Sequence, residues 1–118
     1  MTARESIEVA RAYVALSNAH RVDLIEPMLA RRAVYRSSAV GEYLGREAIL
    51  GMMRSFFSDF PDVGWQCGDF DYTDSIVSFE FVLRATSAKT GEAVQRAGHE
   101  HIEFDAAGLI RSIRVEVA

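Results

Sequence analysis

The stretch from Val94 to Phe104 contains an acid that strand alternation predicts to face the protein core. Successive side chains of a strand point to opposite faces, so every second residue shares a face. Glu100 therefore lies on the same face as Ile102 and Phe104, which are core residues by type. An unpaired carboxylate in a core is costly, so Glu100 has a partner, stays protonated or lines a cavity. An acid that faces a cavity can transfer protons to and from a bound molecule.

Arg96 is the candidate partner of Glu100, because alternation places both side chains on the same strand face. An ion pair between them would lower the pKa of Glu100, whereas an apolar cavity would raise it by penalising the charged form. Gly98 lies between the two residues and leaves room for solvent or ligand rather than a locked contact. We therefore expect a raised pKa, with the ion pair as the alternative.

The other residues that suit catalysis or metal binding are less well placed. His99, His101 and Glu103 follow one another on the opposite face of the same strand. Neighbouring side chains on one strand face are roughly 7 Å apart, too far to converge on a metal ion without a sharp bend, so we expect surface or interface residues. Cys67, the only cysteine, has no activating neighbour and is predicted to be a buried thiol. With no converging ligand set and no phosphate-binding glycine loop, we expect neither a metal nor an organic cofactor.

Three stretches have apolar residues at helical spacing. The first covers about residues 3 to 18 and opens with a capping box, Thr2 to Glu5. A short second helix is predicted from Leu24 to Leu29, where Pro27 is awkward because its ring removes an internal hydrogen bond. The third helix, from Ile49 to Phe60, has the cleanest pattern. These helices have to carry one wall of any site.

Period-two stretches predict strands at residues 33–40, 65–72, 76–86, 94–104 and 109–117. Residues 41–45 are predicted to be a loop, and residues 88–92 a hairpin loop with a glycine. The order is three helices around one strand, followed by a meander of antiparallel strands. This order indicates an α+β fold in which helices cover one face of a curved sheet.

The 118 residues fit one domain, residues 1–118, and 49% apolar residues can fill its core. The net charge of −4 argues against nucleic acid and anionic membranes as partners, because both favour a basic face. The first residues lack the basic and then apolar pattern of a signal peptide, and no apolar run approaches a membrane span. We therefore expect a cytoplasmic protein.

Four short motifs follow one another along the chain, and their order and spacing can be compared with known families. They are Ala12–Asn18 in the first helix, Gly45–Ile49 and Phe57–Asp62 at the two ends of the third helix, and His101–Phe104 with Gly108 near the end of the chain. In these motifs and in its element order, nearly the whole chain resembles the nuclear transport factor 2-like superfamily, in its SnoaL-like and ketosteroid-isomerase-like branch. The resemblance implies a cone-shaped barrel, with three N-terminal helices packed on a strongly curved antiparallel sheet. It also implies a deep apolar pocket and usually a homodimer. Members isomerise, cyclise, hydrolyse or only bind, so the fold leaves the function open.

The resemblance suggests roles for three residues. Tyr13 falls at the position of the isomerases' oxyanion-binding tyrosine, and Glu100 at that of their protonated acid, an aspartate in that family. Two such neutral donors would stabilise an enolate. Ser37 falls where the isomerases carry their proton-shuttling aspartate, and a serine hydroxyl is no base at neutral pH unless it is activated. Glu100 itself then becomes the candidate base, as an acid on a late strand is in SnoaL-type cyclases. The alternative is a core Tyr13 and an inert pair of Glu100 with Arg96.

Two functions stay open: an isomerase, cyclase or hydrolase-like lyase that uses acid–base chemistry without a cofactor, or a non-catalytic ligand-binding or dimerisation module. In both, the ligand is a small apolar or carbonyl-containing molecule. Tyr13 and Glu100 are the candidate catalytic residues, and the candidate substrate-binding residues are Tyr35, Ser37, Phe57, Trp65, Phe79, Phe81, Arg96, Ile102 and Ile113. The outer sheet face is predicted to form a homodimer through Glu80, Val82, Arg84, His99, His101, Glu103, Arg114 and Glu116.

Overall fold

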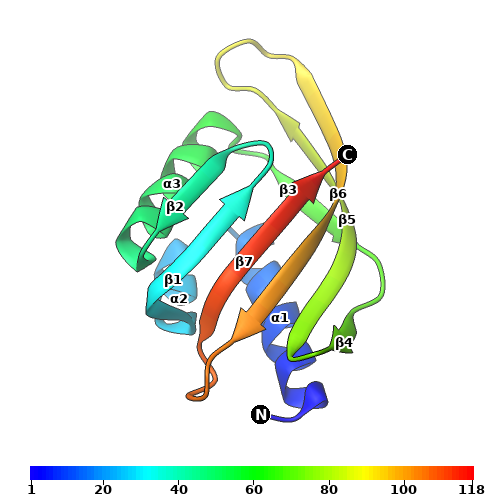
Figure 1. Cartoon of the computed structure of the whole chain (residues 1–118). Coiled ribbons are helices and arrows are strands. Elements are labelled where there is room, and N and C mark those ends of the chain that lie inside the picture. Colours follow the sequence, from blue (N-terminus) through cyan, green and yellow to red (C-terminus); the bar gives the residue numbers. More distant parts are fainter.

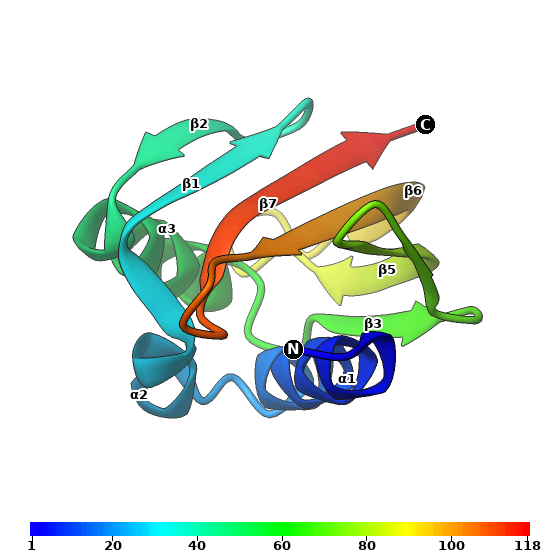
Figure 2. The same ribbon diagram turned by 60° about the horizontal axis from the view of Figure 1, so that its bottom comes forward.

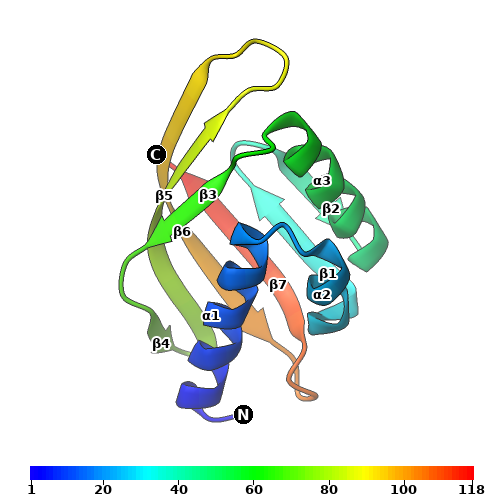
Figure 3. The same cartoon turned by 180° about the vertical axis from the view of Figure 1, so that it is seen from behind.

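The computed structural model describes residues Met1–Ala118 and places three helices against one face of a seven-stranded sheet (Figure 1). The helices are α1 (Ala3–Asn18), α2 (Val22–Ile25) with the 3₁₀ turn η1 (Glu26–Met28), and α3 (Arg46–Asp59). The strands are β1 (Leu29–Ser37), β2 (Gly41–Leu44), β3 (Gly64–Cys67), β4 (Asp71–Thr73), β5 (Ile76–Thr86), β6 (Ala93–Phe104) and β7 (Ile110–Val117). The predicted α+β order is confirmed. Figure 3 shows α1 and α3 on the same side of the sheet.

The sheet has the strand order β2-β1-β7-β6-β5-β3, with β4 also paired to β5. β1 runs parallel to β7, while the other neighbours are antiparallel, so the prediction of an antiparallel sheet is wrong in this one place. The sheet curves around the helices, but its edge strands β2 and β3 do not pair (Figure 2). The sheet is therefore open, and the predicted cone-shaped barrel is not confirmed.

Helix α1 begins at the predicted capping box. The Thr2 hydroxyl accepts a hydrogen bond from the Glu5 backbone N–H at 3.1 Å, and the Glu5 carboxylate accepts one from the Thr2 N–H at 3.0 Å. The buried residues of the helix recur at steps of three and four, which turns one face to the sheet: Ser6, Ala10, Tyr13 and Ser17. The Ser17 hydroxyl donates to the Tyr13 carbonyl at 2.9 Å, so this buried hydroxyl has a hydrogen-bond partner.

The first part of the chain differs from the prediction at three boundaries. The second helix ends at Ile25, and Pro27 lies in the 3₁₀ turn that follows, where its missing N–H breaks no long helical ladder. β1 therefore starts at Leu29, four residues before the predicted strand. Residues predicted to be a loop form β2, which begins at Gly41 and is too short to show a period-two pattern.

The predicted strand at residues 65–72 is two strands, β3 and β4, both paired with β5. The interruption starts at Gly68, whose N–H donates to the Glu80 carbonyl at 2.9 Å. Glycine weakens a strand because it has no side chain to pack. By contrast, β5 spans the predicted residues, and β6 begins one residue before the predicted start.

The core fills the space between the helices and one end of the sheet. Its largest fully buried side chains are Ile25, Leu29, Ile49, Leu50, Val77, Ile102, Ile110 and Ile113. No helix combines the length and apolar composition needed to cross a bilayer. Towards the β5–β6 hairpin, side chains do not fill the space between the helices and the sheet, and a cavity remains.

The β5–β6 hairpin extends beyond the rest of the sheet and is held by the end of α3 (Figure 1). The Ala88 N–H donates to the Asp59 carbonyl at 2.8 Å, and the Thr86 N–H donates to the Asp62 carboxylate at 2.7 Å. Hydrogen bonding from Thr86 lowers the pKa of Asp62, as expected for a carboxylate that accepts a backbone donor. The β5–β6 hairpin is therefore fixed to the end of α3 by hydrogen bonds.

Gly98 is required by the close approach of β7 and of an aromatic ring. It pairs with Phe81 of β5 on one side and Val117 of β7 on the other. A Cβ atom at Gly98 would lie 2.4 Å from the Glu116 carbonyl oxygen and 2.9 Å from Cζ of Phe81. Since backbone cannot yield as a flexible side chain does, only glycine fits.

We predict that Gly98→Ala lowers the free energy of unfolding by about 1–3 kcal/mol through overpacking. The matched control is Gly51→Ala in α3, where the added Cβ has no neighbour within 4 Å. There alanine should raise the free energy of unfolding by about 0.5–1 kcal/mol, because glycine is a poor helix residue. Urea denaturation of both variants tests the pair. A Gly98→Ala variant as stable as the wild type would contradict the proposed contact.

Candidate active site

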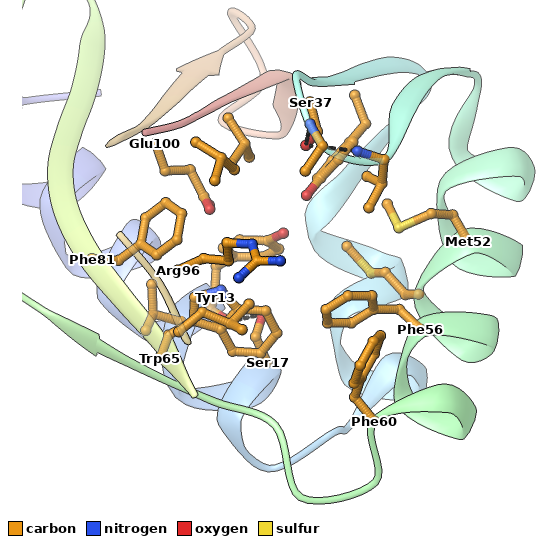
Figure 4. Close-up of a pocket in the computed structure, with 18 of the residues that line it drawn as sticks. Tyr13, Ser17, Ser37, Met52, Phe56, Phe60, Trp65, Phe81, Arg96 and Glu100 are labelled. Carbon is orange, nitrogen blue, oxygen red and sulfur yellow. Dashed lines mark hydrogen bonds between the residues drawn. The ribbon is translucent and has the colours of Figure 1, made fainter. Parts of the chain in front are cut away.

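A cavity of about 240 Å³ lies between the concave sheet face and the C-terminal halves of α1 and α3 (Figure 4). Sixteen of its 20 lining residues are hydrophobic, so a charge inside it loses most of its hydration. The lining comprises Tyr13, Val14, Ser17, Tyr35, Ser37, Ala39, Val40, Met52, Met53, Phe56, Phe60, Trp65, Phe79, Phe81, Leu83, Val94, Arg96, Glu100, Val115 and Val117.

Glu100 reaches this cavity from the middle of β6. Its neighbours across the sheet are Phe79 and Val115, and only 7% of Glu100 is exposed. The carboxyl group has no ion-pair or hydrogen-bond partner in the protein. Burial raises its pKa to about 8, because nothing offsets the lost hydration of the charged form. The rise predicted from the sequence is confirmed in direction, and Glu100 is mostly protonated at neutral pH.

Arg96 is not the partner of Glu100. Its guanidinium donates to the Gln95 carbonyl at 3.0 Å and is exposed at the mouth of the cavity. The strand face between the two side chains is occupied by the ring of Phe81, which lies against Gly98. In Figure 4 the Arg96 guanidinium points into the gap between the two walls, apart from the Glu100 carboxyl. The inert ion pair considered from the sequence is therefore absent.

Two tyrosine side chains share the cavity with Glu100. Tyr13 comes from the buried face of α1 and is 5% exposed, and Tyr35 comes from β1. Burial raises the pKa of both hydroxyls, and the nearby Glu100 charge raises each further. Both tyrosines are therefore neutral hydrogen-bond donors at physiological pH. The pKa of the Cys67 thiol is raised to about 11, chiefly by burial and to a smaller extent by the Glu100 charge, which makes Cys67 a poor nucleophile.

Ser37 has a structural task at the end of β1. Its hydroxyl oxygen accepts hydrogen bonds from the backbone N–H groups of Ala39 at 3.1 Å and Val40 at 3.3 Å. Ser38 next to it accepts from the Val117 N–H at 2.9 Å and so joins this turn to β7. No base contacts the Ser37 hydroxyl, so nothing activates it for proton transfer.

The structure brings eight of the predicted site residues together in the cavity lining: Tyr13, Tyr35, Ser37, Trp65, Phe79, Phe81, Arg96 and Glu100. The other three lie outside it. Phe57 stacks on the His20 ring, with centroids 4.2 Å apart, while Ile102 and Ile113 are core residues. The roles of all eleven stay predictions.

Sequence reasoning missed part of the helical wall. Met52 and Met53 of α3 line the cavity, and Met53 is at the same time a buried residue of the core. Phe56 faces the cavity in place of its neighbour Phe57, since one residue rotates the helix by about 100°. The five-residue segment from Ser37 to Gly41 also contributes Ala39 and Val40, which carry no signal in the sequence.

The histidines of β6 face away from the cavity, on the outer side of the sheet. The His99 ring lies 3.2 Å from the Glu80 carboxylate, and the His101 ring lies 2.8 Å from the Ser78 hydroxyl. Burial, then the charge of Arg114, lowers the pKa of His101. Alternation thus separates the titratable groups of β6 into one acid inside and two histidines outside.

Three solved structures show how widely this fold is shared. SalBIII, an epoxide hydrolase/cyclase-like enzyme in pyran ring formation in polyether salinomycin, is 18% identical with a TM-score of 0.87, covering 98% of this chain and 92% of its own. A protein with a ketosteroid isomerase-like fold from Catenulispora acidiphila, in complex with trimethylamine, is 16% identical with a TM-score of 0.82 and coverages of 92% and 83%. An NTF2-like protein of unknown function from Exiguobacterium sp. 255-15 is 17% identical with a TM-score of 0.80 and coverages of 90% and 94%.

The TM-scores establish a common NTF2-like fold, whereas identities this low show nothing about a shared reaction. No curated protein matches the chain in sequence. Residues 10–113, however, match the SnoaL-like domain along most of the chain, from α1 through the middle of β7. The protein therefore belongs to the SnoaL-like domain family.

Proposed function

We propose that this protein is a cofactor-independent isomerase or cyclase that moves a proton on an apolar carbonyl compound bound in the cavity. The observation that supports it most is the unpartnered, buried Glu100, whose pKa of about 8 lies near physiological pH. Proton-transfer groups work best when their pKa is close to the operating pH. The apolar lining of the cavity suits the carbon skeleton of such a substrate.

In this mechanism the ionised fraction of Glu100 takes a proton from the carbon next to the substrate carbonyl. The electron pair of the broken C–H bond moves into an enolate, whose oxygen receives hydrogen bonds from the Tyr13 and Tyr35 hydroxyls. Protonated Glu100 then returns the proton to a different carbon, which isomerises the substrate. Alternatively, the enolate carbon attacks a second carbonyl of the same molecule, and Glu100 protonates the new alkoxide, which closes a ring.

Glu100 is assigned as the base because no other group in the cavity can act as one near neutral pH. Ser37 is engaged by the turn at Ala39 and Val40. The tyrosine hydroxyls have raised pKa values, and a guanidinium group offers no acceptor for a proton. The first-strand acid that the resemblance implies for steroid isomerases is replaced by Ser37, so the proton transfer has to be carried by β6. The same replacement supports the second candidate, a non-catalytic ligand-binding module.

Enolisation is the shared first step of both reactions, so it can be tested without knowing the substrate. We expect the wild type to accelerate exchange of the α-protons of 2-tetralone in D₂O, measured by proton NMR. Glu100→Gln should reduce this acceleration by roughly 100-fold or more, because the amide cannot accept the proton. Tyr13→Phe should leave the base but reduce the rate by roughly 100-fold through loss of an enolate donor. Wild-type exchange no faster than buffer would favour the binding module instead.

The raised pKa of Glu100 also predicts a pH-dependent stability. Between its ordinary value of 4.5 and about 8, Glu100 is protonated in the folded state and ionised in the unfolded state. The folded state then binds more protons, so stability falls as pH rises, by at most about 1.4 kcal/mol per pH unit. We expect Glu100→Gln to remove this fall.

The measurement is urea denaturation of the wild type and of Glu100→Gln at several pH values from 5 to 8.5. His101 contributes in the opposite sense: its lowered pKa makes stability rise with pH below its ordinary value of 6.5. Comparing the two proteins cancels this contribution, because both contain His101. Parallel curves for the two proteins would mean that Glu100 ionises as freely as in water.

We also propose that two copies pair through the outer face of the sheet. This face carries both signs of charge in close contact, including Glu80 with His99 at 3.2 Å and Arg114 with Glu116 at 3.2 Å. A surface of mixed sign can match itself across a two-fold axis. Val82 is a half-buried apolar residue of the same face.

Light scattering at micromolar concentration should therefore show a dimer at neutral pH. Val82→Glu should shift it to monomer, since it places an unpaired carboxylate inside the contact. Leu24→Glu adds the same charge at an exposed apolar residue of α2 and should leave the dimer intact. A monomeric wild type would overturn the dimer proposal.

A further inference from the structure

Arg96 brings an uncompensated positive charge to the wall of the cavity. It is the only cationic residue in the lining, and its guanidinium bonds only to the Gln95 carbonyl. On the outer face of the sheet, Arg36 and Arg114 each lie within 4.0 Å of a carboxylate. A guanidinium fork without an anion is suited to receive one from a ligand, because it can bind a carboxylate through two parallel hydrogen bonds.

The spacing of Arg96 and Glu100 separates two ends of the cavity. Four strand residues span about 13 Å, and both side chains leave the same face of β6. The ring of Phe81 covers Gly98 between them, which makes the intervening wall apolar. A ligand that lies along this strand therefore meets a cation at one end, an aromatic surface in the middle and Glu100 at the other end.

The opposite wall suits the same kind of ligand. Met52, Phe56 and Phe60 of α3 face the sheet across the cavity, and Trp65 lies on the side of Arg96 (Figure 4). None of these side chains carries a charge, so a second anion-binding or cation-binding point is absent from that wall. The polar groups of a bound molecule therefore contact Arg96 and Glu100 of β6 and the hydroxyls of Tyr13 and Tyr35.

We propose that Arg96 binds a carboxylate at one end of the substrate, while the carbonyl group to be enolised lies at the Glu100 end. The preferred substrate is then an apolar, ring-containing keto acid, which binds more tightly than a neutral ketone of the same shape. The assignment rests on the proposed function for the carbonyl end. Arg96 acts here as a specificity residue, because it contacts the ligand but not the atoms that react.

The test compares two probes of the same shape, naphthalene-1-acetate and naphthalene-1-acetamide, by isothermal titration calorimetry at pH 6.5. The wild type should bind the acid about tenfold more tightly than the amide, a modest preference because the exposed guanidinium is partly screened by water. Arg96→Met should abolish the preference while the amide still binds, which shows that the cavity has folded.

The matched control is Arg84→Met, which removes the same charge from the outer face of the neighbouring strand, where Arg84 bonds to Gln95 and Gln66. It should keep the tenfold preference, so that net charge alone is excluded as the cause. Equal binding of acid and amide by the wild type, or a preference that survives Arg96→Met, overturns the role of Arg96. If neither probe binds the wild type at millimolar concentration, the proposed apolar binding site fails as well, whereas the exchange of 2-tetralone protons reports on Glu100 independently.

Discussion

The strict alternation of side chains along β6 is the constraint on which the candidate site depends. A strand that buries Ile102 has to bury Glu100 as well, and it has to send His99 and His101 outward. The long pairing of β6 with β5 and β7 fixes this choice, because a slip by one residue would turn the whole apolar face to water. The fold therefore forces an acid into an apolar space.

The burial of this acid organises the chemistry around it. The two tyrosines and Cys67 all have raised pKa values, and in each case Glu100 adds to the effect of burial. Only one of these four groups can lose its proton near neutral pH, so the interior holds at most one negative charge. Arg96 stands at the mouth, where its own hydration is retained. The cavity thus combines a neutral, proton-rich interior with a cationic rim.

Much of this could be predicted from the sequence where elements are long. The first and third helices and the strands β5 and β6 repeat their patterns often enough to be recognised, and alternation placed Glu100 correctly. The four residues of β2 are too few to show a periodic pattern. The sequence of β1 alone does not reveal that β1 pairs in parallel with β7. Strand direction and sheet closure depend on contacts between distant segments. Phe57 was predicted to line the site, but it stacks on His20, and Phe56 lines the cavity. Adjacent helix residues differ in direction by about 100°, and their shared aromatic character does not show which one faces the cavity.

The attachment of the β5–β6 hairpin to the end of α3 has a consequence for binding energetics. Two backbone N–H groups, those of Thr86 and Ala88, hold the hairpin against residues 59–62. The wall that carries Arg96 is thus ordered by hydrogen bonds within the protein itself, none of which involves a ligand. A ligand that fits the cavity then loses little affinity to the ordering of the protein on binding. Selection among ligands follows from their fit to a preformed cavity rather than from a conformational change on binding.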